Sequence, residues 1–263
     1  MICPVCGNGN FSQIAVLKER LIQEWKLSPE EVEYINRQQG FQCTNCGCNL
    51  RAMTLADALL KKLRESRLLK DLHRSKKFRD FKLLEINHAG GLHPHLKKQQ
   101  NYTFAEFPDV DIQALPYSDK SFEIIIHSDT LEHVENSLQG LKECYRVLKN
   151  GGVLIYTIPI VIGRLTKKRD SLPNSYHGTQ EEEQGEDYKV WTEYGADFWV
   201  ELISAGFNLV EISTIGNLDS LAICATKTIE TNFQIKHIDR IFVFLSKIRK
   251  TAGRGIKKYG VFR

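Results

Sequence analysis

The sequence has no apolar run long enough to cross a membrane. Its longest apolar stretch, Val153 to Ile162, is interrupted by Thr157 and Pro159, whereas a membrane-spanning helix needs about 20 predominantly apolar residues. The first residues, MICPVCGN, contain neither the basic nor the apolar segment of a secretory signal peptide. Internal repeats and low-complexity tracts are also absent. These absences predict a cytoplasmic protein.

The composition is that of an ordinary globular protein. Of the 263 residues, 42% are apolar and 26% are charged, which excludes wholesale disorder. A chain of this length accommodates one large α/β domain with a small satellite.

Positive charge is concentrated at the end of the chain. From residue 231 to 263 there are nine Lys and Arg against a single acid, Asp239, although the whole chain carries only +4. Apolar residues recur there at near-helical spacing, among them Ile238, Ile241 and Leu245. Two interpretations stay open. This basic tail is a helix that lies on an anionic membrane surface, at the inner face of the membrane, or it is a helix that packs on the parent domain.

The pattern of apolar segments divides the chain into four parts. We expect a cysteine-containing module with a helical insert at 1–50, a helical bridge at 51–81, an α/β domain at 82–228 and the basic amphipathic tail at 229–263. In the α/β domain strands alternate with helices at 136–148 and 192–205, which predicts a doubly wound, mostly parallel sheet. We expect seven strands, the last antiparallel, at 82–86, 102–104, 110–113, 122–128, 153–158, 207–214 and 221–226.

Two CxxCG knuckles, Cys3 to Gly7 and Cys43 to Gly47, stand near the N-terminus. Four thiolates from such knuckles suit a closed tetrahedral zinc site, which is structural rather than catalytic. We therefore predict that zinc is bound by Cys3, Cys6, Cys43 and Cys46. The other interpretation is a set of unrelated thiols, and Cys48 is a candidate spare ligand.

The long spacer between the knuckles contains a helix signal. Ser28 is a typical N-cap, Pro29 suits the first helical position and Glu31 completes a capping box. The spacer is therefore expected to be helical.

Three segments of the α/β domain carry a family resemblance: LLEINHAGG at 83–91, DIQALPYSDKSFEIIIHSDTLEHV at 111–134, and ECYRVLKNGGVLIYTIP at 143–159. With them, residues 82–226 resemble the class I S-adenosylmethionine-dependent methyltransferases of the type 11-like group. The whole chain also looks like uncharacterised methyltransferases encoded near bacterial polysaccharide genes. The resemblance implies a Rossmann-like fold, S-adenosyl-L-methionine as cofactor and methyl transfer as the activity.

The resemblance assigns roles to nine residues at the carboxyl edge of the sheet, where open α/β sheets bind ligands. Glu85 orients the turn after the first strand or contacts the amino group of the cofactor, and Glu106 accepts the ribose hydroxyls. Asp111 meets the adenine amino group, and Ile112 packs on the ring. The remaining five are Asn87, Ala89, Gly91 and the strand-end pair Ser128 and Asp129.

The turn after the first strand departs from the family pattern. Where the family has GxGxG, this chain has Asn87, Ala89 and Gly91. Asn tolerates left-handed backbone better than most residues, so Asn87 can replace the first glycine. Ala89 brings a methyl group toward the cofactor.

The acceptor side is less defined. Residues 163–190 lack periodicity, which is typical of a lid or a binding loop, and His177 is the candidate general base. His133 is expected to be a structural residue near the cofactor. We expect a small-molecule or glycan-linked acceptor.

The alternative is a catalytically silent methyltransferase fold whose zinc module binds nucleic acid or protein. Nucleic acid is disfavoured, because the sequence lacks the aromatic and basic motifs of single-strand readers and the knuckle segment is not strongly basic.

Overall fold

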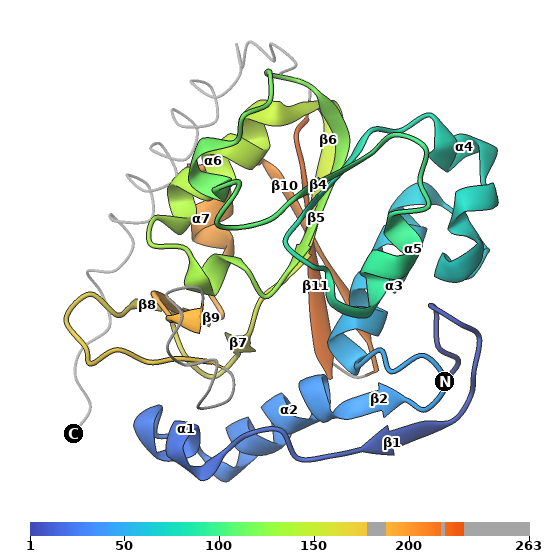
Figure 1. The fold of residues 1–263 in the computed structure, drawn as a ribbon. Coiled ribbons are helices and arrows are strands. Elements are labelled where there is room, and N and C mark those ends of the chain that lie inside the picture. The colour runs from blue at the N-terminus through green and yellow to red at the C-terminus, as the bar shows by residue number, and fades with distance from the viewer. Residues whose placement is uncertain (178–187, 217–218, 229–263) are drawn as a thin grey trace, which may run out of the picture. The chain divides into compact units, whose positions relative to one another are not determined.

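The computed structural model describes residues 1–177, 188–216 and 219–228, so the predicted basic tail lies outside the described residues. Its centre is a sheet of six strands in the order β10-β11-β6-β5-β3-β4 (Figure 1). The strands are β3 (Leu83–Ile86), β4 (Tyr102–Ala105), β5 (Phe122–Ser128), β6 (Leu148–Thr157), β10 (Leu209–Ile215) and β11 (Ser220–Thr226).

The sheet is mostly parallel, as predicted. β4, β3, β5 and β6 run parallel to one another. β11 pairs antiparallel with β6, and β10 pairs antiparallel with β11. The carboxyl ends of β3, β4 and β5 therefore meet at one edge of the sheet.

Six strands, not seven, form this sheet in the described residues. The expected strand at 110–113 is instead a short 3-10 turn, η3 (Ile112–Ala114). The Asp111 side chain accepts a hydrogen bond from the backbone N–H of Gln113 at 2.8 Å, and this local bond competes with strand pairing.

Helices cover both faces of the sheet, and Figure 1 shows them on opposite sides. α3 (Leu50–Leu63) packs on β6, β10 and β11, whereas α6 (Ser137–Val147) and α7 (Trp199–Ser204) lie against the other face. Successive side chains of β5 point to alternate faces, so Ile124 and Ile126 join one apolar cluster and Ile125 joins the other.

The N-terminal segment is part of the same compact unit, which spans Met1–Thr228. β1 (Phe11–Gln13) pairs antiparallel with β2 (Phe41–Cys43). Between them lie α1 (Glu19–Glu24) and α2 (Pro29–Gly40). The predicted capping box is confirmed, because the Ser28 hydroxyl accepts from the Glu31 N–H and the Glu31 carboxylate accepts from the Ser28 N–H.

Short elements connect these parts. One differs from the prediction of a helix at 192–205: its first residues form β9 (Thr192–Gly195), which pairs with β7 (Ile160–Val161) and β8 (Lys167–Lys168). The others are η1 (Leu69–Arg74), α4 (Lys76–Arg79), η2 (Gly90–Leu92), α5 (His93–Leu96) and η4 (Leu131–His133). No helix of the described residues is long and apolar enough to cross a bilayer.

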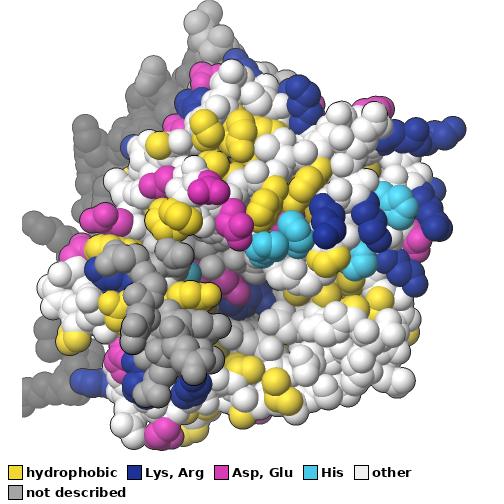
Figure 2. Space-filling model, viewed as in Figure 1, with side chains coloured by type: hydrophobic (Ala, Val, Ile, Leu, Met, Phe, Trp, Pro, Cys, Tyr) yellow, Lys and Arg dark blue, Asp and Glu magenta, His cyan; other side chains and the backbone are white. Residues whose placement is uncertain are grey.

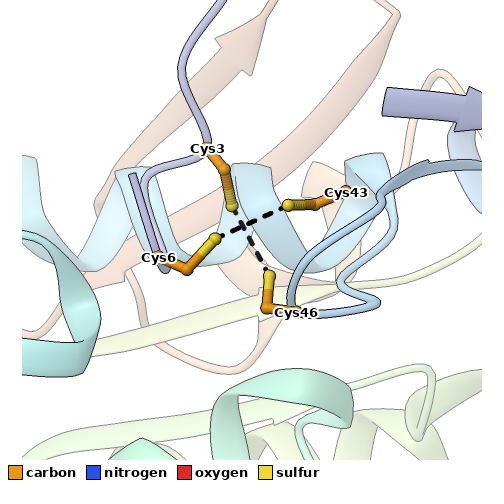
Figure 3. A group of neighbouring side chains, drawn as sticks. All are labelled: Cys3, Cys6, Cys43 and Cys46. Atoms are coloured by element: carbon orange, nitrogen blue, oxygen red, sulfur yellow. Dashed lines mark hydrogen bonds between the residues drawn. The ribbon is translucent and has the colours of Figure 1, made fainter. Parts of the chain in front are cut away.

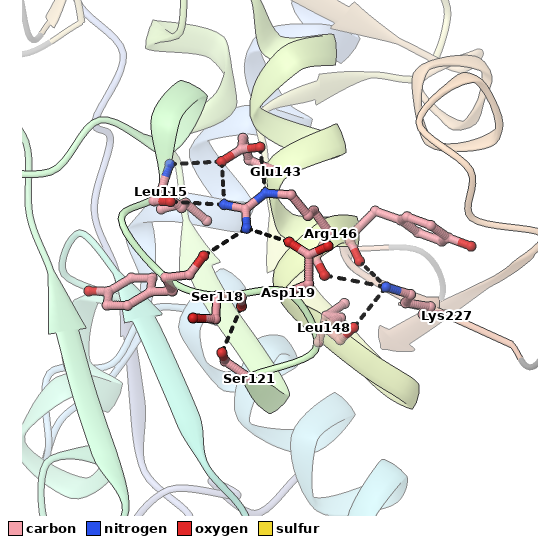
Figure 4. Close-up of polar contacts among 10 residues, drawn as sticks. Leu115, Ser118, Asp119, Ser121, Glu143, Arg146, Leu148 and Lys227 are labelled. Atoms are coloured by element: carbon pink, nitrogen blue, oxygen red, sulfur yellow. Dashed lines mark hydrogen bonds and ion pairs between the residues drawn. The ribbon is translucent and has the colours of Figure 1, made fainter.

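Arg146 of α6 holds the segment that follows η3 (Figure 4). Its guanidinium donates to both carboxylate oxygens of Glu143 at 2.8–2.9 Å and to Asp119 at 2.8 Å. It also donates to the backbone carbonyls of Leu115 and Tyr117 at 2.9 and 2.7 Å. One side chain thus fixes the path of the chain from η3 to β5.

We predict that Arg146→Met lowers the free energy of unfolding by about 2 kcal/mol, because it leaves several partly buried acceptors unpaired. Urea unfolding measures the change. The control is Arg74→Met, which removes an exposed ion pair with Asp71 and should cost less than about 0.5 kcal/mol. Equal costs for the two variants would contradict this assignment.

Candidate functional site: a cavity at the carboxyl edge of the sheet

A cavity of about 860 Å³ opens at the carboxyl ends of β3, β4 and β5. One wall comes from the sheet edge and the turns that follow it, and the facing wall comes from α1, α2 and the residues around them. In Figure 2, acidic and histidine side chains gather around a hollow on this face. Of the predicted site residues, the cavity is lined by Asn87, Glu106, Asp111, Ile112, Asp129 and His177.

The buried side chain of Glu85 holds the turn after β3 by a hydrogen bond. This carboxylate is fully buried and accepts from the Ala89 N–H at 2.8 Å and from the Tyr102 hydroxyl at 2.6 Å. Its second oxygen lies 3.1 Å from His93 Nδ1. Glu85 is not among the residues that line the cavity, so its carboxylate orients the turn.

Asn87 takes the left-handed conformation that a glycine would supply, with φ of 52°. Its side-chain oxygen accepts from the Phe107 N–H at 3.0 Å. The side chain therefore links the turns that follow β3 and β4. This agrees with the expectation that Asn87 stands in for the first family glycine.

Ala89 and Gly91 face the protein interior rather than the cavity. Ala89 is fully buried in the apolar cluster on the α3 face. Contrary to our expectation, its methyl group does not line the cavity. A Cβ on Gly91 would lie 2.4 Å from the Sγ of Cys48. Gly91 is thus needed for close packing of the turn against the second cysteine knuckle.

The adenosine side of the predicted site is open. Glu106 is about half exposed, and its nearest partner is His88 Nε2 at 3.4 Å. Asp111 caps η3, and Ile112 is buried with one side on the cavity. The arrangement presents two carboxylates beside an apolar surface.

At the end of β5 a buried arginine contacts the predicted site. Arg51, in the first turn of α3, is 2% exposed and forms an ion pair with Asp129, which has φ of 49°. Its other nitrogen, Nη2, donates to Gln38 of α2 at 3.3 Å. Ser128 exchanges a hydrogen bond with Thr157 at 2.8 Å and does not line the cavity.

Glu132, His133 and His177 lie close together in the lining of the cavity. One ligand atom from each lies within 4.8 Å of the others, and the rings of His133 and His177 are 5.0 Å apart. Burial raises the pKa of Glu132 well above its usual value, and the nearby Asp129 adds to this rise. Burial also lowers the pKa of His177 to about 3, so its imidazole is neutral and a weak base at pH 7.

The irregular segment before His177 docks on the N-terminal helices. Trp25 donates from Nε1 to the Ser175 hydroxyl at 2.8 Å. Arg164 forms a bidentate pair with Glu31 at 2.6 Å. Sequence reasoning missed this wall, whose only signal was the apolar spacing of Val16, Leu17, Leu21 and Trp25.

The four predicted cysteines converge from the two knuckles, as Figure 3 shows. Cys3 and Cys46 sulfurs are 3.7 Å apart, and Cys6 and Cys43 sulfurs are 3.5 Å apart. Sulfurs that bind zinc at about 2.3 Å in a tetrahedron lie about 3.8 Å apart, so the set fits the ion.

Burial raises the pKa of the Cys3 and Cys46 thiols, whereas the pKa of Cys43 is lowered. Burial opposes ionisation of Cys43, but the amides of Cys46 and Asn45 bring its pKa down to about 6. Cys48 is outside the four-sulfur group, and burial raises its pKa to about 11.

Residues 85–156 match the family model described as "Methyltransferase domain". Within these residues the chain is similar to class I S-adenosylmethionine-dependent methyltransferases. A curated relative from Mycolicibacterium smegmatis, described as a "Probable S-adenosylmethionine-dependent methyltransferase", is 33% identical over 78 residues. This match covers 28% of the present chain, and the chain spans only 30% of that relative's length.

Two solved structures match part of this chain. A SAM-dependent methyltransferase from Thermotoga maritima is 18% identical, with a TM-score of 0.36, over 65% of this chain and 94% of that chain. An arsenic(III) S-adenosylmethionine methyltransferase from Chlamydomonas reinhardtii is 14% identical, with a TM-score of 0.34, over 55% of this chain and 69% of that chain.

We predict that Gly91→Ala in the methyltransferase domain costs about 1–3 kcal/mol of stability, because the new methyl group overlaps the Cys48 sulfur. In a Cys48→Ala background the nearest Cys48 atom is 3.6 Å away, an ordinary contact, so the cost should largely disappear. Thermal unfolding of the four proteins in this double-mutant cycle measures the coupling. The same cost in both backgrounds would contradict the predicted contact.

Proposed function

We propose that this protein transfers a methyl group from S-adenosylmethionine to a small-molecule or glycan-linked acceptor bound in the cavity. The observation that carries the proposal is the meeting of Asn87, Glu106, Asp111, Ile112 and Asp129 around one cavity. These residues come from the ends of β3, β4 and β5 and from η3, and all five belong to the matched segment, residues 85–156.

The cavity suits the cofactor in size and chemistry. Its volume of about 860 Å³ is within the range of small-molecule sites. The half-exposed carboxylate of Glu106 would accept the ribose hydroxyls, and Ile112 would pack on the adenine ring beside Asp111. S-adenosylmethionine supplies an electrophilic methyl group on a sulfonium ion when it is bound.

The remaining residues would position the acceptor and exclude water. Trp25, Tyr188 and Trp191 line the part of the cavity near His177, and flat aromatic faces of this kind can stack on a sugar or another ring. Methyl transfer is an in-line displacement, so holding the two reactants in line supplies much of the rate enhancement.

We propose a structural zinc ion for the four cysteines. The sulfur spacing supports this role. Four thiolates would fill the tetrahedral coordination of zinc and leave no position for a substrate or water. The ion would fix the two knuckles and thereby the Cys48 contact with the turn at Gly91.

The first test of the function is cofactor binding. Isothermal calorimetry of the full chain should detect S-adenosylhomocysteine, and Glu106→Ala should weaken its binding about ten-fold or more, because charge-assisted hydrogen bonds are lost. Glu33→Ala, an exposed change on α2, is the control and should leave affinity unchanged. A wild type that does not bind S-adenosylhomocysteine would favour the silent-scaffold alternative.

The second test concerns zinc. Elemental analysis should give about one zinc per chain for the wild type, as one tetrahedral site requires. Cys3→Ser should lose the ion and lower the unfolding temperature, because structural metal binding contributes to folding free energy. Cys48→Ala should keep the ion. A wild type that contains no zinc and is nevertheless fully stable would refute the assignment.

A further inference from the structure

A second group of potential ligands lies apart from the four cysteines. Glu132 and His133 belong to η4, which follows β5, and His177 comes from the irregular segment that docks on the N-terminal helices. All three line the cavity, and their ligand atoms lie within 4.8 Å of one another. Two imidazoles and one carboxylate thus face a common point.

Glu132 is the first sign that this group is incomplete without a ligand. Its side chain is 1% exposed, and neither carboxylate oxygen has a hydrogen-bond partner in the described residues. The ring nitrogen recorded beside it, His133 Nε2, is 3.7 Å away. A buried carboxylate without partners is costly, and a bound cation would satisfy it.

His133 is held in the orientation of a metal ligand. Its Nδ1 lies 3.0 Å from the backbone carbonyl of Lys189. A carbonyl oxygen only accepts, so Nδ1 carries the proton and Nε2, which faces Glu132, carries the lone pair. Metal-ligating histidines typically donate their other ring N–H to a carbonyl or carboxylate in this way.

We propose that Glu132, His133 and His177 bind one divalent first-row metal ion inside the cavity. Imidazole and carboxylate ligands suit such ions at about 2.0–2.2 Å, so shifts of about 1 Å or less would bring the three ligand atoms into range. Asp129 and Arg51, which face the same cavity, neutralise each other as an ion pair. The Glu132 carboxyl group has no such partner in the described part of the chain, and a bound cation would stabilise its ionised form.

The proposed metal site also restricts the kind of acceptor that the cavity would bind. Three protein ligands leave coordination positions open toward the cavity, and these would take an oxygen atom of the acceptor, such as a hydroxyl. His177 is then a ligand rather than the predicted general base. The choice of a hydroxylated acceptor rests on the proposed function, whereas metal binding itself does not.

The experiment is a titration of the full-length protein with Mn²⁺, which prefers oxygen and nitrogen to thiolate ligands. Electron paramagnetic resonance follows the loss of the free-ion signal. The wild type should bind one Mn²⁺ per chain, and Glu132→Gln and His177→Gln should each weaken binding about ten-fold or more. His88→Gln, a histidine of the same cavity outside the group, should keep wild-type affinity.

Two results would overturn the metal site: a wild type that binds no Mn²⁺ at millimolar concentration, or Glu132 and His177 variants that bind it as the wild type does. If the variants do not fold, pulsed resonance of the Mn²⁺-loaded wild type decides, because bound imidazole gives nitrogen couplings and their absence refutes the site. Calorimetry with S-adenosylhomocysteine separates the two proposals. A protein that binds S-adenosylhomocysteine but does not bind Mn²⁺ refutes only the metal site. A protein that binds Mn²⁺ but does not bind S-adenosylhomocysteine refutes only the proposed function.

Discussion

The ion pair between Arg51 and Asp129 joins the N-terminal segment to the edge of the sheet. The Arg51 side chain is 3% exposed, and a charge buried to that extent needs a partner of opposite sign. Asn49 caps α3 with its side chain, so the position of Arg51 follows directly from the second cysteine knuckle. At the other end, Asp129 ends β5 in a left-handed conformation. Together with the hydrogen bond from Arg51 to Gln38, this pair links the sheet edge to α3 and α2.

A second contact ties the knuckles to the cofactor turn. Cys48 packs against Gly91 so closely that no side chain fits there. The turn is also held from the opposite side by the buried carboxylate of Glu85. The proposed zinc ion would therefore support the methyltransferase domain directly, because the knuckles help to fix the shape of the turn.

The features that could be predicted from the sequence depend on interactions between residues that are close in the chain. The capping box of Ser28 and Glu31 and the left-handed Asn87 depend on neighbouring residues and were predicted correctly. The strand expected at 110–113 failed because the side chain of Asp111 bonds to its own turn. The helix expected from Thr192 failed because its first residues pair with β7 and β8, which lie far away in sequence.

The residues of the site that sequence reasoning missed depend on long-range pairing. Arg51 reads as an ordinary helix residue until Asp129 is placed beside it, and Glu132 and His133 become notable only when His177 joins them. The apolar residues of the spacer gave no sign of which surface they would cover. The sequence therefore predicted the residues at the sheet edge of the cavity but not those of its opposite wall.

If the cavity that the N-terminal segment closes holds the cofactor, binding should protect both of its walls from solvent. Hydrogen–deuterium exchange with and without S-adenosylhomocysteine measures this protection. We expect slower exchange on binding at residues 86–88, 106–113 and 129–135, and also at residues 16–27 of the facing wall. Binding that protects the sheet edge but leaves residues 16–27 unchanged would contradict this placement of the cofactor.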